Sequence, residues 1–224
     1  MKYTIISILI IGILVLGGFY FYKSKAGKDI PMIQQGSDLP KPTPVGTFEV
    51  DTNKSNINWS LETSDTKSYK GTAKFASGKG TIKDGIVTGG SFEVDLNSIK
   101  ENNNADKLEV YFKSVEFFNT EIYPTAKFEI TKISKTPITP ADYTVTGNLT
   151  LKGITKEVTF PAIISKQKDS TFIASGDVDM DTSLWGIKYG GNSLFGSLGD
   201  KAGSNSVKLS LFIVTRPVTE EVSE

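Results

Sequence analysis

The chain has 224 residues, of which 38% are hydrophobic, and its 25 basic side chains balance its 25 acidic ones. A balanced charge provides no net field to attract nucleic acid, so nucleic-acid binding is disfavoured. The sequence contains no Cys and no His, which excludes thiol nucleophiles, imidazole bases and the metal sites that depend on these residues. The length suits one membrane segment and one domain of ordinary size.

The N-terminal residues 1–22 are predicted to form a single transmembrane helix or signal anchor. Residues 3–22 carry no charge and are rich in Ile and Leu, and at about 1.5 Å per residue such a run spans the roughly 30 Å of bilayer hydrocarbon. Aromatic residues 20–22 end the run and lysines follow, which is typical of a membrane interface. The alternative is a signal peptide cleaved near Ser24 and Ala26.

Residues 23–46 are predicted to be a proline-rich linker. Four prolines alternate with Gly, Ser and Gln in this stretch, and too few apolar residues recur periodically to build a helix or strand. In an extended polyproline conformation the linker would rise about 3.1 Å per residue. It would then act as a spacer between the membrane segment and the domain that follows.

From residue 47 onward, apolar and polar residues alternate with period two in segment after segment. Successive side chains of a strand face opposite ways, so one face of each such strand is buried. Closure into a barrel hides the strand edges and gives all apolar rows a common interior. We predict an all-β fold: an antiparallel up-and-down, lipocalin-like barrel of about eight strands over residues 47–216, with one or two short helices, and a tail at residues 217–224. The inward rows include Phe92, Val94 and Leu96; Tyr143, Val145, Gly147, Leu149 and Leu151; Val158, Phe160, Ala162 and Ile164; Phe172, Ala174, Gly176, Val178 and Met180; and Val207, Leu209, Leu211 and Ile213.

Two short turns are predicted from their residue types. Asp84 and Gly85 would join two strands of a hairpin, and Lys152 and Gly153 would separate two others, because hairpin turns favour such pairs. Up-and-down connectivity follows for these strands.

One helix is predicted to interrupt the strands at residues 105–118. Leu108, Phe112 and Val115 recur there at helical spacing, after an Asn run at residues 102–104 that supplies turn and cap residues.

Several short motifs follow one another along the chain. They are residues 84–99; Lys113, Ser114, Val115, Glu116, Phe117 and Phe118; Tyr123, Pro124, Thr125, Ala126, Lys127 and Phe128; residues 147–156; and residues 185–190 with residues 198–201. In this order they resemble the motifs of the YceI-like family of lipocalin-like, polyisoprenoid-binding proteins of the bacterial envelope. Each motif alone is weak, but their joint occurrence in order is specific, and the resemblance covers about residues 47–215.

The resemblance implies a helix-capped barrel whose interior binds a long isoprenoid or similar lipid, without a catalytic residue or a cofactor. It also implies an envelope location, with the chain anchored in the membrane and the barrel outside the cytoplasm, or secreted after signal-peptide cleavage. A bare charge count opposes this orientation, because Lys23, Lys25 and Lys28 outnumber Lys2. The chain departs from the family pattern at Tyr111 and Phe112, where many members carry His and Leu.

Nine residues are candidates for contact with the lipid. Most are aromatic residues on inward rows, and flat rings suit the branches and double bonds of a prenyl chain. The alternative is plain core packing, because small barrels fill much of their interior with side chains. The candidates are Trp59, Phe75, Phe92, Val94, Phe128, Val158, Phe160, Phe172 and Trp185.

Other functions are weaker interpretations of the sequence. Asp177, Asp179 and Asp181 lie on an outward row without the Gly and Glu of a calcium loop, so they indicate a solvated face and no metal site. A carboxylate-based enzyme ranks last, because the alternation places no pair of acids inward. A structural or partner-binding module with a filled barrel is the main alternative, and the sequence leaves the oligomeric state open.

Overall fold

The computed structural model describes residues 45–62, 68–102, 106–137, 139–187, 206–216 and 219–221. These residues fall within one unit of the chain, Pro42–Glu224. The transmembrane helix or signal anchor predicted for residues 1–22 and almost all of the linker lie outside the described residues. Within the described ranges, no helix has the length and apolar character needed to cross a bilayer.

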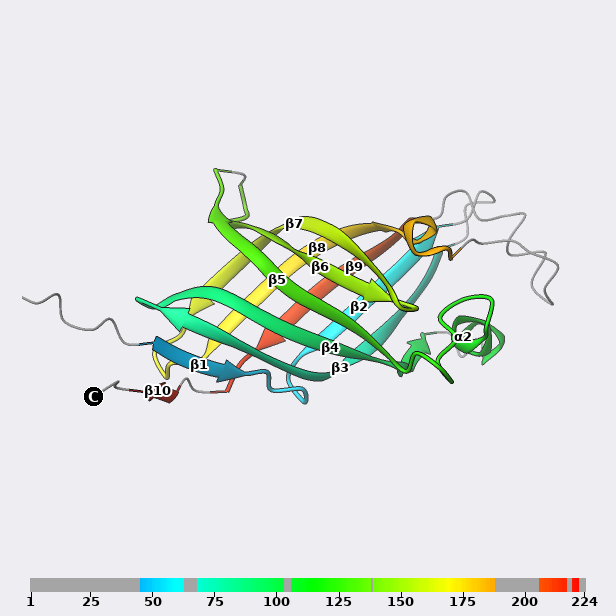
Figure 1. The fold of residues 1–224 in the computed structure, drawn as a ribbon, viewed down its shortest axis with the longest axis horizontal. Helices are drawn as coiled ribbons and strands as arrows, with labels where there is room; N and C mark the ends of the chain where they lie inside the picture. Colours follow the sequence, from blue (N-terminus) through cyan, green and yellow to red (C-terminus); the bar gives the residue numbers. More distant parts are fainter. Residues whose placement is uncertain are drawn as a thin grey trace, which may run out of the picture. The chain divides into compact units, whose positions relative to one another are not determined.

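Eight of the described strands form a closed antiparallel barrel (Figure 1). Each strand pairs with the next along the chain, and the last pairs with the first, so the predicted up-and-down barrel is confirmed. The eight strands are β2 (Asn56–Glu62), β3 (Ser68–Lys83), β4 (Ile86–Glu101), β5 (Thr125–Lys135), β6 (Tyr143–Leu151), β7 (Ile154–Lys166), β8 (Phe172–Asp181) and β9 (Ser206–Val214). Two further strands, β1 (Val45–Glu49) and β10 (Thr219–Glu221), extend the sheet beside β3.

The period-two alternation corresponds to the inside and the outside of the barrel. Along β8, for example, Val178 and Met180 are buried whereas Asp177, Asp179 and Asp181 are exposed. Every inward row predicted from the sequence consists of buried or half-buried residues. The apolar interior is therefore built directly by the strand periodicity.

Both predicted turns are present and have the backbone geometry that their residues favour. Asp84 and Gly85 join β3 to β4 with φ angles of 53° and 72°, and Lys152 and Gly153 join β6 to β7 with φ angles of 48° and 75°. Two successive positive φ angles are typical of type I′ turns, whose twist matches that of the flanking strands.

The predicted helix is shorter than expected. Helix α2 covers Asp106–Lys113, and hydrogen-bonded turns replace the helix from Ser114 onward. The Ser114 hydroxyl donates to the Tyr111 carbonyl at 2.7 Å, and this local bond competes with continued helix. As a result Val115, predicted on the buried face with Leu108, is exposed.

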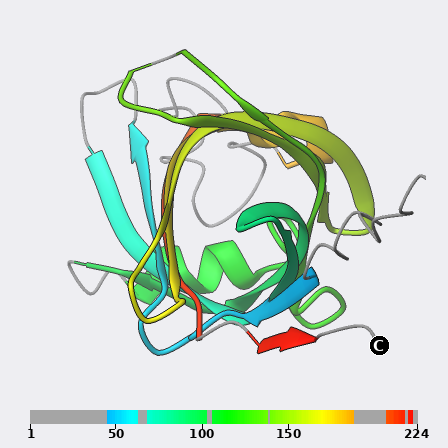
Figure 2. The ribbon, with the colours of Figure 1, turned by 90° about the vertical axis from the view of Figure 1, so that its left-hand side faces the viewer.

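Helix α2 lies across one end of the barrel, as the view along the barrel in Figure 2 shows. Phe112 from the helix packs edge-to-face against Trp59 of β2, with ring centroids 5.2 Å apart. Phe117 and Phe118, from the turns after the helix, pack on Phe112 and on each other. This aromatic cluster closes the end of the barrel that carries α2.

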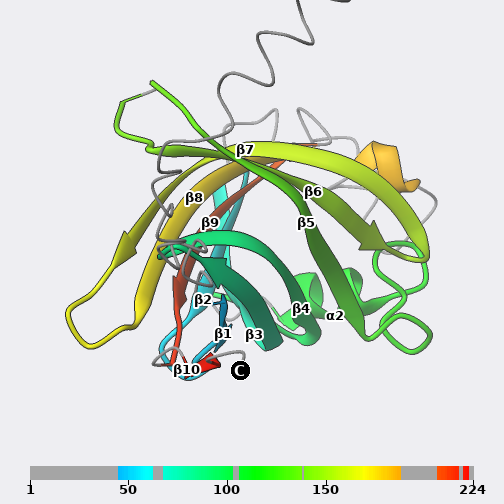
Figure 3. The same cartoon turned by 60° about the vertical axis from the view of Figure 1, so that its left-hand side comes forward.

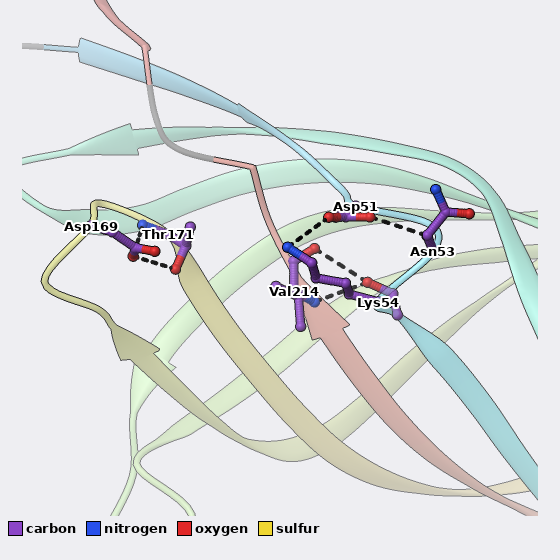
Figure 4. A network of polar contacts seen from close by, with 7 residues as sticks. Asp51, Asn53, Lys54, Asp169, Thr171 and Val214 are labelled. Atoms are coloured by element: carbon purple, nitrogen blue, oxygen red, sulfur yellow. Dashed lines mark hydrogen bonds and ion pairs between the residues drawn. The ribbon is translucent and has the colours of Figure 1, made fainter.

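A hydrogen-bonded corner between β1 and β2 holds these two strands to the end of β9 (Figure 4). The Asp51 amide donates to the Val214 carbonyl at 2.8 Å, and the Val214 amide donates to the Ser55 hydroxyl at 2.9 Å. Nearby, the Thr215 hydroxyl accepts a hydrogen bond from the Phe172 amide at 2.8 Å. The β7–β8 turn is thereby tied to the same corner.

Candidate binding site

The barrel interior contains two apolar cavities, stacked along the barrel. The larger has a volume of about 150 Å³ and the smaller, next to α2, about 110 Å³. In the part of the chain that the structure describes, no polar atom is exposed to either cavity. Such walls favour an apolar occupant, because a polar group placed there would lose its hydrogen bonds to water without replacement.

Four aliphatic side chains line both cavities and therefore form the boundary between them. They come from four different strands, β2, β9, β6 and β4, so the boundary is a ring around the interior. We call this set the dividing ring; its members are Ile57, Val94, Leu149 and Leu209.

Most of the nine candidate residues predicted from the sequence lie on these walls. Seven line the larger cavity: Phe75, Phe92, Val94, Phe128, Val158, Phe160 and Phe172. Trp59 lines the smaller cavity, which Val94 also borders. Two ring pairs lie on the wall of the larger cavity. Phe75 and Phe92, on the paired strands β3 and β4, have centroids 6.5 Å apart, and Phe128 of β5 and Phe160 of β7, on either side of β6, have centroids 5.8 Å apart.

Trp185 is the one candidate that lines neither cavity. Its side chain is 1% exposed, and its indole nitrogen donates to the Leu149 carbonyl at 3.1 Å. It belongs to η1 (Thr182–Trp185), a short helix that Asp181 caps by accepting from the Ser183 amide. The structure therefore places Trp185 in the packed core behind β6.

The sequence reasoning missed the aliphatic part of the walls and the contribution of the α2 region. Ile57, Leu149 and Leu209 were not among the candidates, although Leu149 and Leu209 were assigned to inward rows, because most of the predicted contacts were aromatic side chains. Phe112 and its neighbours Phe117 and Phe118 also line the smaller cavity. They lie outside the period-two segments, so strand alternation gave no signal for them.

Two acids are buried near α2, which the alternation did not predict. Glu101 ends β4 and is 3% exposed, and Glu109 lies on α2. The strand register shifts between the pairs Thr72↔Lys100 and Lys74↔Asp95, so the simple alternation fails over this stretch.

Glu109 is held in its ionised form. The Glu101 amide donates to one of its carboxylate oxygens and Lys100 Nζ to the other, both at 3.0 Å. The Glu101 hydrogen bond, helped by Lys100, lowers the pKa of Glu109 below its ordinary value of 4.5 despite the opposing effect of burial. A carboxylate held this way is a poor general acid, and neither Glu101 nor Glu109 lines a cavity.

The outward aspartates of β8 have structural partners. Asp177 accepts a hydrogen bond from the Ser210 hydroxyl at 2.7 Å, and Asp181 caps η1. Among the described residues, no three acidic side chains are grouped closely enough to hold a metal ion.

The geometry agrees with comparisons to known proteins. The YceI-like domain family matches residues 48–215, three quarters of the sequence. The chain belongs to this family. Its barrel, its capping helix and its two I′ turns lie within the matched residues.

Curated relatives resemble part of the chain. A UPF0312 protein of Photorhabdus laumondii is 35% identical over 45% of this chain and 59% of its own length. Protein YceI of Escherichia coli strain UMN026 is 32% identical over 44% of this chain and 50% of its own length. The chain thus spans between half and three fifths of these two relatives.

Solved structures share the fold at low sequence identity. The crystal structure of Burkholderia cenocepacia BcnA is 21% identical, with a TM-score of 0.60 over 74% of this chain and 98% of that one. A polyisoprenoid binding domain from Saccharophagus degradans, implicated in plant cell wall breakdown, is 13% identical, with a TM-score of 0.55 over 76% of this chain and 98% of that one.

Proposed function

We propose that the barrel binds a long apolar lipid chain, and that this chain is an isoprenoid. The observation that carries the proposal is the pair of stacked cavities with purely apolar walls along one barrel. The structurally similar domain from Saccharophagus degradans, described as polyisoprenoid binding, supports the same class of ligand.

The energetics suit a ligand recognised through its chain. Each buried methylene contributes about 0.8 kcal/mol, so a chain of several isoprene units binds without specific polar contacts even after its ordering costs. The cavities are small for such a chain, since about 150 Å³ holds a molecule the size of benzene. A long chain therefore requires the two cavities to join, which in turn requires the dividing ring to move aside.

The test compares the purified protein with two variants that carry a new Phe at adjacent positions of β7, one facing inward and one facing outward. Lipids that copurify are identified by native mass spectrometry and solvent extraction. Val158→Phe fills part of the larger cavity, whose wall includes Val158, whereas Thr159→Phe places the same side chain on the exposed outer face. We expect prenyl chains in the unmodified protein and in Thr159→Phe, and much less in Val158→Phe.

The second candidate function is a partner-binding module with a filled barrel. Exposed apolar residues around α2 favour it: Val110, Val115 and Ile122 are 65%, 69% and 67% exposed. A protein that copurifies in place of lipid, and that is lost on Val115→Ser, would support this candidate and count against lipid binding.

We propose that the barrel lies outside the cytoplasm, anchored through residues 1–22 or secreted after cleavage. The absence of cysteine gives a direct test. Thr155→Cys introduces one thiol at an exposed position of β7, which a membrane-impermeant maleimide should label in intact cells. Labelling only after lysis would place the barrel in the cytoplasm.

A further inference from the structure

The hydrogen-bond ladder between β4 and β5 covers only part of these strands. It runs from Asp95↔Thr125 to Ser91↔Glu129 and stops there. Beyond it, residues 86–90 of β4 pair with β3, and residues 130–135 of β5 pair with β6. Figures 1 and 3 show the two strands running apart toward the end of the barrel opposite α2. We call residues 86–90 and 130–135 the unpaired edges.

Each unpaired edge contains a β-bulge close to the point where the ladder stops. On β4, Thr88 is the extra residue between the pairs Thr81↔Gly89 and Ile82↔Val87. On β5, Thr131 is the extra residue between the pairs Ile130↔Gly147 and Lys132↔Thr146. Bulges bend a strand and increase its twist, so the separation is built into both strands.

The bulges are fixed by side-chain hydrogen bonds on the outer surface. The Thr88 hydroxyl donates to the Thr81 carbonyl at 3.3 Å, and the Thr131 hydroxyl donates to the Thr146 carbonyl at 3.2 Å. The Thr88 bond holds the β4 bulge to β3, and the Thr131 bond holds the β5 bulge to β6, so neither bond joins β4 to β5. Pairing the two edges would require both bulges to be removed.

The unpaired edges border the larger cavity. Val87 from β4 and Ile130 and Ile133 from β5 all line its wall. At the α2 end, by contrast, Phe112, Phe117 and Phe118 pack on one another and line the smaller cavity, so that end offers no comparable gap between strands. At the other end, the hydrogen-bonded corner of Figure 4 joins β1, β2 and β9 on the rim, away from the unpaired edges.

From these observations we infer that an apolar chain passes into the larger cavity sideways, between the unpaired edges of β4 and β5. This inference rests on the proposed function and specifies the route by which the ligand enters the barrel. Because the cavity walls expose no polar atom, a polar head group would lose its hydration inside. The ligand is therefore an amphiphile or a hydrocarbon whose chain enters first and whose head, if present, stays at the unpaired edges in contact with water.

The test bridges the two edges covalently in the full chain. Thr88 and Thr131 are both exposed, and the sequence has no native cysteine, so Thr88→Cys/Thr131→Cys provides one defined pair for bismaleimidoethane. The matched control is Thr146→Cys/Thr159→Cys, at directly paired positions of the continuous β6–β7 ladder. A third pair, Val115→Cys/Lys152→Cys, bridges the α2 end, where Lys152 Nζ donates to the Val115 carbonyl.

The rates of binding and release are measured by stopped-flow fluorescence with dansyl-labelled geranylgeraniol, on each protein before and after bridging. We expect the Thr88–Thr131 bridge to slow both rates by about tenfold or more, with the affinity changed by less than about twofold, because a blocked route alters kinetics and leaves the bound state intact. The control bridge should leave both rates unchanged.

Three outcomes would overturn the inference. Unchanged rates after the Thr88–Thr131 bridge would reject this route, and so would slowing that occurs only with the Val115–Lys152 bridge, which would place the route at α2. An unmodified protein that does not bind the probe at all would reject the proposed function together with the route.

Discussion

Gly147 on β6 shows how a single missing side chain shapes the wall of the larger cavity. Atoms of the Phe128 ring, on the neighbouring strand, lie too close to Gly147 for a Cβ atom to fit there. The Glu129 carbonyl oxygen is also only 2.5 Å from that position. The absence of a side chain at Gly147 therefore leaves room for the Phe128 ring, which also contacts Phe160.

We predict that Gly147→Ala destabilises the barrel by about 1–3 kcal/mol, the usual cost of forcing extra atoms into a packed site. The free energy of unfolding from urea titration measures the effect. Gly89→Ala is the control, because the nearest atom to its added Cβ would be Thr81 Oγ1 at 3.5 Å, an ordinary contact. Equal stability of the two variants would contradict this view of Gly147.

Glu109 links the capping helix to the barrel through a charge. Its depressed pKa means that the unfolded chain takes up the proton first as the pH falls. The ionised group therefore contributes stability above its ordinary pKa of 4.5, and this contribution is lost as the pH falls through the lower pKa of the folded state.

We predict that Glu109→Gln lowers the free energy of unfolding at neutral pH by about 1–2 kcal/mol, because a charged hydrogen-bond acceptor is replaced by a neutral one. The difference from the unmodified protein should shrink below pH 4.5, where the native carboxylate loses its advantage. Urea titrations across this range test it, with exposed Glu116→Gln as the control. A difference that stays constant with pH would argue against the charge as the cause.

At the scale of elements, the strands follow from the sequence and the helix end does not. Alternation along β8 or β9 repeats over many residues, so it survives local irregularities, and the turn pairs Asp84–Gly85 and Lys152–Gly153 specify their own geometry. The end of α2 depends on one side-chain hydrogen bond, from Ser114 to the Tyr111 carbonyl. The burial of Glu101 depends on a local register shift. Neither the end of α2 nor the burial of Glu101 produces a periodic pattern in the sequence.

Helix α2 packs against the barrel through one face only. Two substitutions, one on the buried face and one on the exposed face, should therefore differ in their effect on stability. Phe112→Ala removes a buried ring that contacts Trp59 and Phe117, and we expect a loss of about 3–5 kcal/mol. Val110→Ala, on the same helix but 65% exposed, should change the free energy of unfolding by less than about 0.5 kcal/mol. Thermal or urea unfolding measures both. Similar losses in the two variants would show that α2 does not pack as described.

At the scale of the whole molecule, the interior is one apolar space divided in two. Period-two patterning predicted a common apolar interior and the side chains of each strand that face it. It could not predict how much space remains, because that depends on how side chains such as Trp185 and Phe112 fill the volume. The position of the dividing ring likewise depends on three-dimensional packing of residues from four strands.

The dividing ring leads to a prediction about ligand length. In Val94→Ala/Leu149→Ala, two of its four members are shortened, so the cavities should merge. We expect the affinity for geranylgeraniol to rise relative to that for geraniol by about tenfold, since a long chain no longer has to displace side chains. Competition against a fluorescent lipid measures the ratio. An unchanged ratio would mean that the ring does not limit the length of the bound chain.

Val45 at the start of β1 and Glu221 in β10 are direct partners in the sheet. The described barrel thus begins and finishes at neighbouring points, so a short peptide could join them and new chain ends could be cut at a surface turn. In a circularly permuted protein of this kind, the segment that precedes Val45 could be attached at a different surface turn. In the unpermuted protein, a reporter fused after Glu221 would be attached next to Val45, where that segment joins the barrel.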